Sequence, residues 1–190
     1  YIDKSADFAK ALPIVINSKT HRPSVCNAAE TLLVHKEIAN EFLPIVLKEL
    51  NQAGVILHCD QASLEVANSL SIPARLATEE NWSTEYGVLE MNVAVVADLD
   101  SAAAHILKYG TNHTEAIVTE SNESAERFIS LADCAAVMVN ASTRFTDGQE
   151  MGFGAEIGIS NQKLHARGPM GLEQMTTTTW IVRGDGQIRK

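Results

Sequence analysis

The sequence predicts an α/β protein built around a largely parallel β-sheet. Short apolar runs rich in Val, Ile and Leu alternate with longer segments whose apolar residues recur at a helical period. Successive runs are separated by single helical segments, and such crossovers are right-handed and join parallel strands. A chain of 190 residues with 45% hydrophobic content is sufficient for one domain with a substantial core.

A helix is predicted near the start of the chain. It begins at Ser5, with Ser5 or Asp3 as the N-cap, and its apolar residues continue through Ile16. Pro13 lies within this run, so the helix is expected to be kinked or interrupted there. The helix must end before Pro23, because the chain turns at that residue.

Regular alternation follows up to residue 139. The next helix is expected to start near Asn40, because Pro44 is best tolerated close to the beginning of a helix. Asp60 is the expected N-cap of one later helix, and Gly110 is the expected end of another. Strands are predicted at residues 31–34, 55–57, 91–96, 115–118 and 136–139, and helices at 40–50, 61–70, 98–109 and 122–131.

Residues 140–168 interrupt this alternation with five glycines and two phenylalanines. Loops of this length in a compact domain are usually functional. This loop leaves the carboxyl end of the last strand, where open α/β sheets bind ligands. We therefore expect it to border a ligand site at that end of the sheet.

A final strand is predicted at Met175–Arg183. Four consecutive threonines precede Trp180, Ile181 and Val182, and β-branched and aromatic residues of this kind favour a strand, which ends at the Gly184 turn. The alternating unit before it is already complete. This strand is therefore expected to pair with a segment outside this chain or with a second subunit.

The composition argues against several classes of function. The net charge is −9, with 24 acidic and 15 basic residues, which disfavours binding a nucleic-acid backbone over a broad face. No apolar stretch approaches the roughly 18 residues of a membrane span, and the opening residues do not resemble a signal peptide. Three widely spaced cysteines predict reduced thiols, without a disulfide framework or a metal site. We expect a cytoplasmic protein that binds neither nucleic acid nor membrane.

Cys26 is the candidate nucleophile, although a lone cysteine is more often a small packed hydrophobe. It follows a proline turn and has polar neighbours, which places it in a loop. A helical turn opening near Asn27, together with Arg22, would favour its thiolate form. Cys59 and Cys134 adjoin apolar strand residues and are expected to be structural.

Other polar residues are weaker candidates. The six histidines lack metal-ligand spacing. His21 could act as a base near Cys26, and His165 is a further functional candidate. Arg144 could bind a carboxylate or a phosphate, although an exposed arginine is the commoner outcome. Gly152-Phe-Gly154 lacks the third glycine and the acid of a dinucleotide fingerprint.

Three segments carry a resemblance to a known family. The first is NSKTHRPSVCNAAETLLVHKEIANEFLP, and the second is Glu85-Tyr86-Gly87 leading into VAVVADLDSAAAHILKYGTNHTEAIVTE. The third is VNASTRFTDGQEMGFGAEIGISNQKLHARGPMGLEQMTTTTW. Together they resemble the aldehyde dehydrogenase superfamily and, within it, the gamma-glutamyl phosphate reductase family of proline biosynthesis. The resemblance runs from the first residue to about Trp180.

This resemblance implies a domain organisation and a reaction. Residues 1–172 would form a three-layer, aldehyde-dehydrogenase-like catalytic domain, residues 173–190 a C-terminal oligomerisation strand, and the cofactor-binding domain would lie outside this chain. The implied reaction is the NADPH-dependent reduction of gamma-glutamyl phosphate to glutamate-5-semialdehyde and phosphate. Cys26 matches the family's nucleophile, which expels phosphate and forms a thioester that hydride reduces. The Cys26 amide is the oxyanion donor that this chain offers. The chain alone is expected to be inactive.

Further site residues follow from the same resemblance. Glu85 matches a glutamate that contacts the nicotinamide-side ribose, although Tyr86-Gly87-Val88 departs from the family's usual pattern. His21 stands where the family more often has glutamine, which argues against an essential base there. The residues that match the loop beside the substrate pocket are Asn140, Ser142, Thr143 and Arg144.

The resemblance also implies partners, and alternatives remain. It implies a homo-oligomer assembled through the C-terminal strand, with glutamate 5-kinase as a further partner. One alternative is a general aldehyde dehydrogenase domain of unknown substrate. Another is a non-catalytic oligomerisation module when the chain is isolated. The stretches 140–145 and 165–169 resemble the reductases specifically and favour the first interpretation over a general dehydrogenase.

Overall fold

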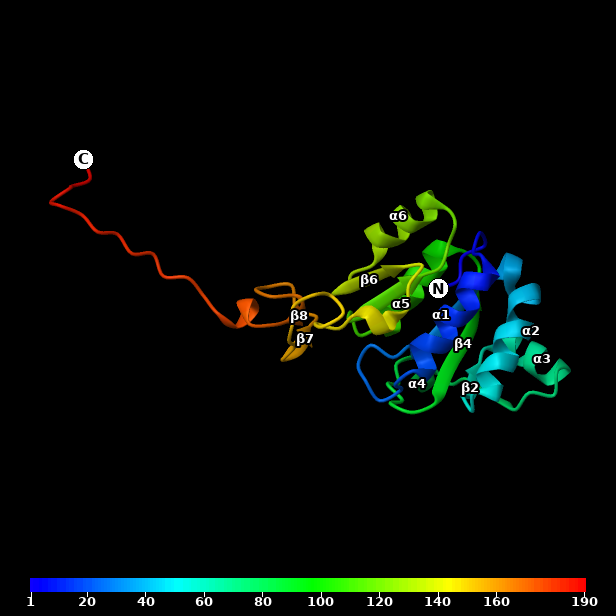
Figure 1. Cartoon of the computed structure of the whole chain (residues 1–190). Helices are drawn as coiled ribbons and strands as arrows, with labels where there is room; N and C mark the ends of the chain where they lie inside the picture. The colour runs from blue at the N-terminus through cyan, green and yellow to red at the C-terminus, as the bar shows by residue number, and fades with distance from the viewer.

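Parallel strands form the centre of the protein, whose computed structural model describes residues 1–190 (Figure 1). A parallel pair lies beside a larger set of four parallel strands in the order β1-β4-β2-β3. The α/β prediction is confirmed, and β3 is the one strand of this sheet that the sequence pattern missed. The strands are β1 (Thr31–His35), β2 (Ile56–Cys59), β3 (Ala74–Leu76), β4 (Glu90–Val96), β5 (Thr114–Ile117) and β6 (Ala136–Val139).

The first residues of the chain join the two sets of strands. Ile2 forms parallel bridges with Val34 of β1 and with Val118, which directly follows β5. The Val118 N–H donates to the Tyr1 carbonyl at 2.9 Å. Tyr1–Asp3 therefore lies between β1 and β5, and one continuous sheet runs from β3 to β6.

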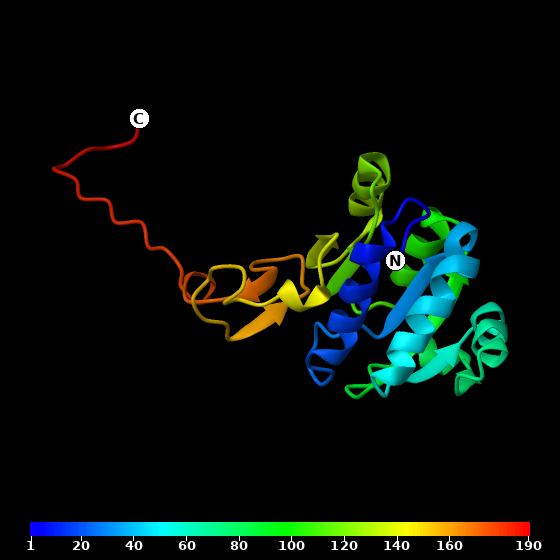
Figure 2. The same ribbon diagram turned by 45° about the vertical axis from the view of Figure 1, so that its right-hand side comes forward.

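Helices cover both faces of this sheet, as Figures 1 and 2 show. Successive side chains of a strand point to opposite faces of the sheet. Leu32 and Val34 therefore belong to the larger core, beneath α1, α2 and α3. Leu33 belongs to a smaller core on the other face, together with Phe128 of α6. The three-layer architecture is thus confirmed. The helices are α1 (Phe8–Thr20), α2 (Lys36–Gln52), α3 (Gln61–Ser69), the short α4 (Glu79–Trp82), α5 (Leu99–Tyr109) and α6 (Asn122–Leu131).

The first helix differs from its prediction in two ways. Its N-cap is Asp7, whose side chain accepts the Ala9 N–H at 2.8 Å, and not Ser5 or Asp3. Asp3 is instead buried in a network with Ser5 and Thr119. The helix also continues through Pro13 without interruption. A proline removes one backbone hydrogen bond, and here the buried face of α1 outweighs that loss.

The second helix likewise starts earlier than predicted. It begins at Lys36, with His35 as the N-cap accepting the Glu37 N–H at 3.1 Å, and Pro44 lies in its interior. Five large apolar side chains on its inner face are fully or almost fully buried, and this burial offsets the hydrogen bond that the proline removes. These side chains are Phe42, Leu43, Val46, Leu47 and Leu50.

Later elements follow the predictions closely. Asp60 caps α3 by accepting the Ser63 N–H at 2.8 Å. α5 ends at Gly110, and α6 and β6 have the predicted bounds. No helix of the protein combines the length and the apolar character required to cross a membrane.

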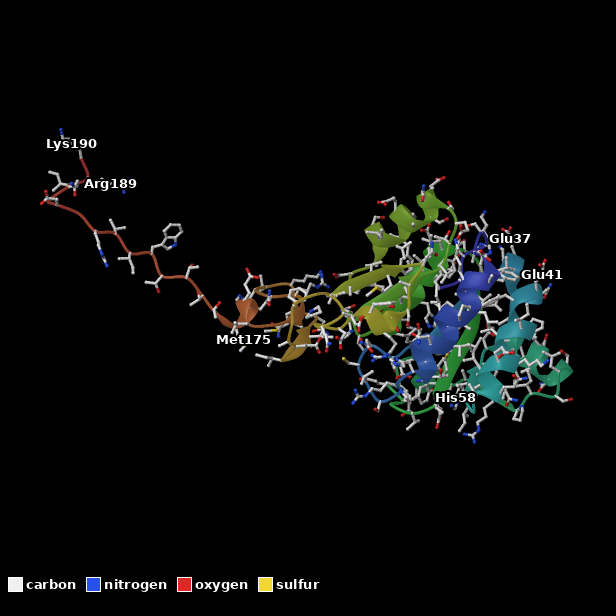
Figure 3. The ribbon with its side chains drawn as sticks, viewed as in Figure 1. Glu37, Glu41, His58, Met175, Arg189 and Lys190 are labelled. Atoms are coloured by element: carbon white, nitrogen blue, oxygen red, sulfur yellow. The ribbon has the colours of Figure 1, made fainter.

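The C-terminal segment projects away from the sheet, on the side opposite α2 and α3 (Figures 1 and 2). A small antiparallel hairpin of β7 (Gly158–Ser160) and β8 (Gly168–Met170) precedes it. Residues 176–190, here called the tail, are exposed, and Figure 3 shows them extending from Met175 to Lys190. The strand predicted at Met175–Arg183 does not form in this chain, because a strand needs a hydrogen-bonding partner and none lies beside the tail.

Candidate active site

Cys26 lies in the loop between α1 and β1, and its side chain is exposed. The Ala28 N–H donates to the Val25 carbonyl at 3.0 Å, so the loop turns at Cys26 and then leads directly into β1. No helical turn opens at Asn27. The prediction that helix amide dipoles favour a Cys26 thiolate is therefore wrong.

Arg144 holds the residue next to Cys26. Its Nη1 donates to Asn27 Oδ1, and its Nε donates to His21 Nδ1 at 3.3 Å. Asn27 is buried, and its Nδ2 donates to the Thr146 carbonyl at 2.9 Å. Both ends of the Asn27 amide are thus fixed by the loop that follows β6, and the backbone of Cys26 is fixed with them.

That loop reaches Cys26 by folding back along the sheet. The Ser142 and Ser18 hydroxyl oxygens are 3.1 Å apart, and the Thr143 N–H donates to Ser18 Oγ at 3.2 Å. Thr114 Oγ1 donates to Thr146 Oγ1 at 2.9 Å, which ties the loop to the first residue of β5. The short 3-10 turn Thr143–Phe145 therefore lies against α1.

A cleft of about 170 Å³ lies beside Cys26. The first residues of β1 and of β5 line it, including Thr31 and Thr114. The cleft is therefore at the amino ends of these strands, and the expected position at the carboxyl ends is wrong. The loop after β6 still borders it, because that loop folds back. Polar residues that line the cleft include Cys26, Asn27, Glu85, His113, Glu115 and Thr143.

Opposing influences act on the Cys26 thiol. Partial burial raises its pKa, and the negative charges of Glu156 and Glu85 raise it further. The Cys26 backbone N–H and the Arg144 guanidinium lower the pKa, but the net direction is upward. Arg144, and not the exposed Arg22, is the arginine that acts on this sulfur. In this chain Cys26 is therefore mainly a neutral thiol at pH 7.

The other two cysteines are structural, as predicted. Cys59 and Cys134 are both buried. Burial raises the pKa of Cys59 to about 12 and that of Cys134 to about 11. Cys26 is thus the one exposed cysteine of the chain.

The predicted site residues are only partly brought together. Cys26, Glu85 and Thr143 line the cleft, and Ser142 and Arg144 lie directly behind it through their contacts with Ser18 and Asn27. Asn140 lies at the other end of β6. There its side chain exchanges hydrogen bonds of 2.9 and 2.8 Å with the backbone of Thr119.

His165 and Arg167 stabilise the hairpin region outside the cleft. His165 is exposed, and its Nε2 lies 3.2 Å from the Gln174 carbonyl oxygen. Arg167 donates to Asp133 at 3.1 Å. No group of three or more His, Cys, Asp or Glu side chains in residues 1–190 is arranged to hold a metal ion.

Sequence reasoning missed Asn27 and His113. The contact of Asn27 with Arg144 spans 117 residues, which no local pattern reveals. His113 precedes β5 in an unremarkable polar stretch. Its Nε2 is buried without a hydrogen-bond partner, as is Thr143 Oγ1, and both residues line the cleft.

Known proteins resemble this chain over its whole length. No protein-family model matches it. It is 60% identical over 189 residues to a gamma-glutamyl phosphate reductase of Thermobifida fusca, covering 100% of this chain and 44% of that protein. The crystal structure of gamma-glutamyl phosphate reductase from Thermotoga maritima superposes with a TM-score of 0.93 at 50% identity, covering 100% of this chain and 45% of that one.

A more distant structure shares the fold. Glyceraldehyde-3-phosphate dehydrogenase from Methanocaldococcus jannaschii, complexed with NADP, superposes with a TM-score of 0.57 at 14% identity, covering 75% of this chain and 39% of that one. The chain spans about half the length of the curated relatives that it matches, 44% in the case of the Thermobifida fusca protein. By sequence along its full length, and by its aldehyde-dehydrogenase-like fold, this chain belongs to the gamma-glutamyl phosphate reductase family.

Proposed function

We propose that this chain supplies the nucleophile-bearing half of an NADPH-dependent reductase that converts gamma-glutamyl phosphate to glutamate-5-semialdehyde and phosphate. The reaction would belong to proline biosynthesis in the cytoplasm. The observation that carries the proposal is the position of Cys26, which is exposed at the cleft while the neighbouring Asn27 is fixed. Residues 1–172 would form the catalytic domain, and the cofactor-binding domain would lie outside this chain.

Cys26 would act on the acyl carbon of the substrate. The thiol first loses its proton to solvent water. Sγ then forms a bond to that carbon, and the carbon–oxygen bond to phosphate breaks with its electrons leaving on the phosphate. The product is a thioester. After reduction, the carbon–sulfur bond of the hemithioacetal breaks, the electrons return to Sγ and the semialdehyde is released. The Cys26 N–H is proposed to stabilise the intervening oxyanion.

Arg144 is proposed to bind the departing phosphate. The positive charge of its guanidinium lowers the pKa of the Cys26 thiol. The guanidinium also has N–H donors beyond those that bind Asn27 and His21. Thr143 is proposed to contact the substrate from the cleft wall, and Ser142 to hold Thr143 in place. Asn140 has no part in this proposal, because Thr119 occupies its side chain at the other end of β6.

The chain offers one residue to the cofactor. When bound, NADPH supplies the hydride that reduces the thioester. Glu85 is exposed at the cleft, and its free carboxylate suits a pair of ribose hydroxyl donors. The NADP complex of the Methanocaldococcus jannaschii dehydrogenase supports this cofactor for the shared fold. One contact of this kind does not hold a dinucleotide, so the isolated chain is expected to have negligible turnover.

The deciding experiment measures the reverse reaction. The full-length protein that contains this chain is expected to reduce NADP⁺ with glutamate-5-semialdehyde only when phosphate is added, because phosphate must release the acyl group from Cys26. A general aldehyde dehydrogenase would instead release the acid with water. Turnover that does not depend on phosphate would therefore refute the proposed reaction and favour that alternative.

The tail is proposed to assemble the protein into a homo-oligomer. Trp180 and Val182 are more than 90% exposed, and Ile181 is 74% exposed, so the tail presents apolar side chains and an unpaired backbone. A second copy could pair with this backbone as a strand. A kinase that makes the labile acyl phosphate, glutamate 5-kinase, is the further partner that we propose.

Removing the tail tests its role in assembly. A chain ending at Met175 is expected to sediment as a monomer, whereas the complete chain is expected to form at least a dimer. The substitution Asp185→Asn, beyond the apolar residues, serves as a control and should leave the assembly intact. Equal sedimentation of the truncated and complete chains would exclude the tail as the contact.

A further inference from the structure

His113 lies in the wall of the cleft with one ring nitrogen unused. The residue is 8% exposed, and its Nδ1 lies 2.7 Å from Thr114 Oγ1. Its Nε2, on the other side of the ring, is buried and has no partner in the protein. A buried polar atom of this kind is costly when it stays unpaired. Because His113 lines the cleft, a ligand there is a natural partner.

The hydrogen-bond direction fixes which nitrogen carries the proton. The Thr114 hydroxyl has one hydrogen, and it donates that hydrogen to Thr146 Oγ1 at 2.9 Å. Towards His113 the same oxygen must therefore accept, which places the imidazole proton on Nδ1. Nε2 then carries a free lone pair. Burial lowers the pKa of His113, and Glu85 and Glu156 only partly oppose this, so the ring is neutral.

The surroundings of Nε2 suit a cation. Thr143 Oγ1 is another buried atom without a partner on a residue that lines the cleft, and a hydroxyl oxygen can also accept a hydrogen bond. Glu85 and Glu156 act on His113 and also on Cys26, which places the imidazole and the thiol near the same two carboxylates. A ligand group at this point would therefore meet acceptors and negative charge close to the nucleophile.

We propose that His113 Nε2 and Thr143 Oγ1 bind the α-ammonium group of an amino-acid substrate whose side-chain carbonyl reacts at Cys26. This inference rests on the proposed function and adds its substrate specificity. An ammonium group has three donors and suits two neutral acceptors beside carboxylates. In glutamate-5-semialdehyde the carbon that bears this group is three bonds from the aldehyde carbon. His113 thus distinguishes an amino acid from the corresponding simple aldehyde acid.

Two substitutions separate this role from a structural one. His113→Asn keeps a donor for Thr114 but removes the Nε2 acceptor, whereas His113→Gln restores an acceptor near the Nε2 position. In the full-length protein, His113→Asn is expected to raise the KM for glutamate-5-semialdehyde about 10- to 100-fold, the range for a lost hydrogen bond to a charged group. The KM for 5-oxopentanoate, which lacks the amino group, should not change. His113→Gln should recover part of the loss.

A matched control uses another buried histidine. His58 on β2, labelled in Figure 3, pairs with Glu90 at 2.8 Å and stacks on Tyr86. His58→Asn removes an imidazole of similar burial outside the cleft. It is expected to lower stability without changing the ratio of the two KM values.

Binding measurements make the inference independent of turnover. By calorimetry, the wild-type protein should bind L-glutamate more tightly than glutarate, and His113→Asn should abolish that preference. If no reductase activity is found but the preference for glutamate depends on His113, the proposed reaction at Cys26 fails and the ammonium-binding role of His113 stands. If the protein is active and His113→Asn raises the KM values for both aldehydes equally, this inference is overturned. It is also overturned if the wild-type protein does not prefer L-glutamate to glutarate.

Discussion

Cys26→Ala is expected to lower the phosphate-dependent reduction of NADP⁺ by the full-length protein by about 10⁴- to 10⁶-fold, the range seen when an enzyme loses its nucleophile. Without Sγ no thioester can form. Cys26→Ser should lose nearly as much, because a hydroxyl is a far weaker nucleophile than a thiolate. The side chain is exposed, so the free energy of unfolding should change by less than about 0.5 kcal/mol.

Chemical labelling provides a second readout for Cys26. Iodoacetamide is expected to modify this cysteine alone in the folded chain, because burial protects Cys59 and Cys134. Since the pKa of Cys26 is raised, its labelling rate should increase with pH through the alkaline range. Cys134→Ala is the matched control and should retain activity. Near-normal turnover in both Cys26 variants would refute the nucleophile assignment.

Lys19→Met is expected to lower the free energy of unfolding by about 3 kcal/mol, the lower end of the range for breaking a buried ion pair. The Lys19 side chain is completely buried, and its Nζ lies 2.6 Å from Glu30 Oε2. The same ammonium lies 5.9 Å from the centre of the Tyr86 ring. Removing it leaves the Glu30 carboxylate, 20% exposed, without its cation.

The loss of stability caused by Lys19→Met is also expected to depend on pH. Burial raises the pKa of Glu30, and Lys19 counteracts this, so the pKa should rise further in the variant. A carboxyl group whose pKa is higher in the folded than in the unfolded state takes up protons on folding, and its protein loses stability as pH rises. The difference between variant and wild type should therefore grow as the pH rises above 4.5, the ordinary value for a glutamate.

Urea unfolding at several pH values measures this effect. The double variant Lys19→Met/Glu30→Gln replaces both charges, so it should be more stable than the single variant at neutral pH and should lose the extra pH dependence. A single-variant loss that is the same at all pH values would show that packing, and not the ion pair, is responsible.

The architecture could be predicted from the sequence because the pattern of apolar residues reflects which residues are buried. The pattern located α6 and β6 with their observed bounds. It missed β3, in which Ala74 is only partly buried and Arg75 and Leu76 are exposed. It also overestimated the effect of Pro13 and Pro44, because the stabilisation of α1 and α2 comes from tertiary packing that the residue type alone does not reveal.

The site was less predictable, because its contacts join residues that are distant in the chain. The family resemblance identified Cys26, Glu85 and Thr143, which line one cleft. It could not show that Arg144 acts through Asn27, or that the loop after β6 folds back to the amino end of β5. The expected helix dipole at Cys26 failed because the chain enters β1 without a helical turn.

The segment Tyr1–Asp3 has a consequence for how the protein unfolds. It is the sole hydrogen-bonded connection within the sheet between β1 and the β5–β6 pair. Asp3 reinforces it through Thr119, whose Oγ1 donates to Asp3 Oδ2 at 2.8 Å. Opening of the β5–β6 pair therefore breaks the sheet at this three-residue segment, while Leu33, Ala94 and Val96 still connect the pair to the larger set of strands through the smaller core.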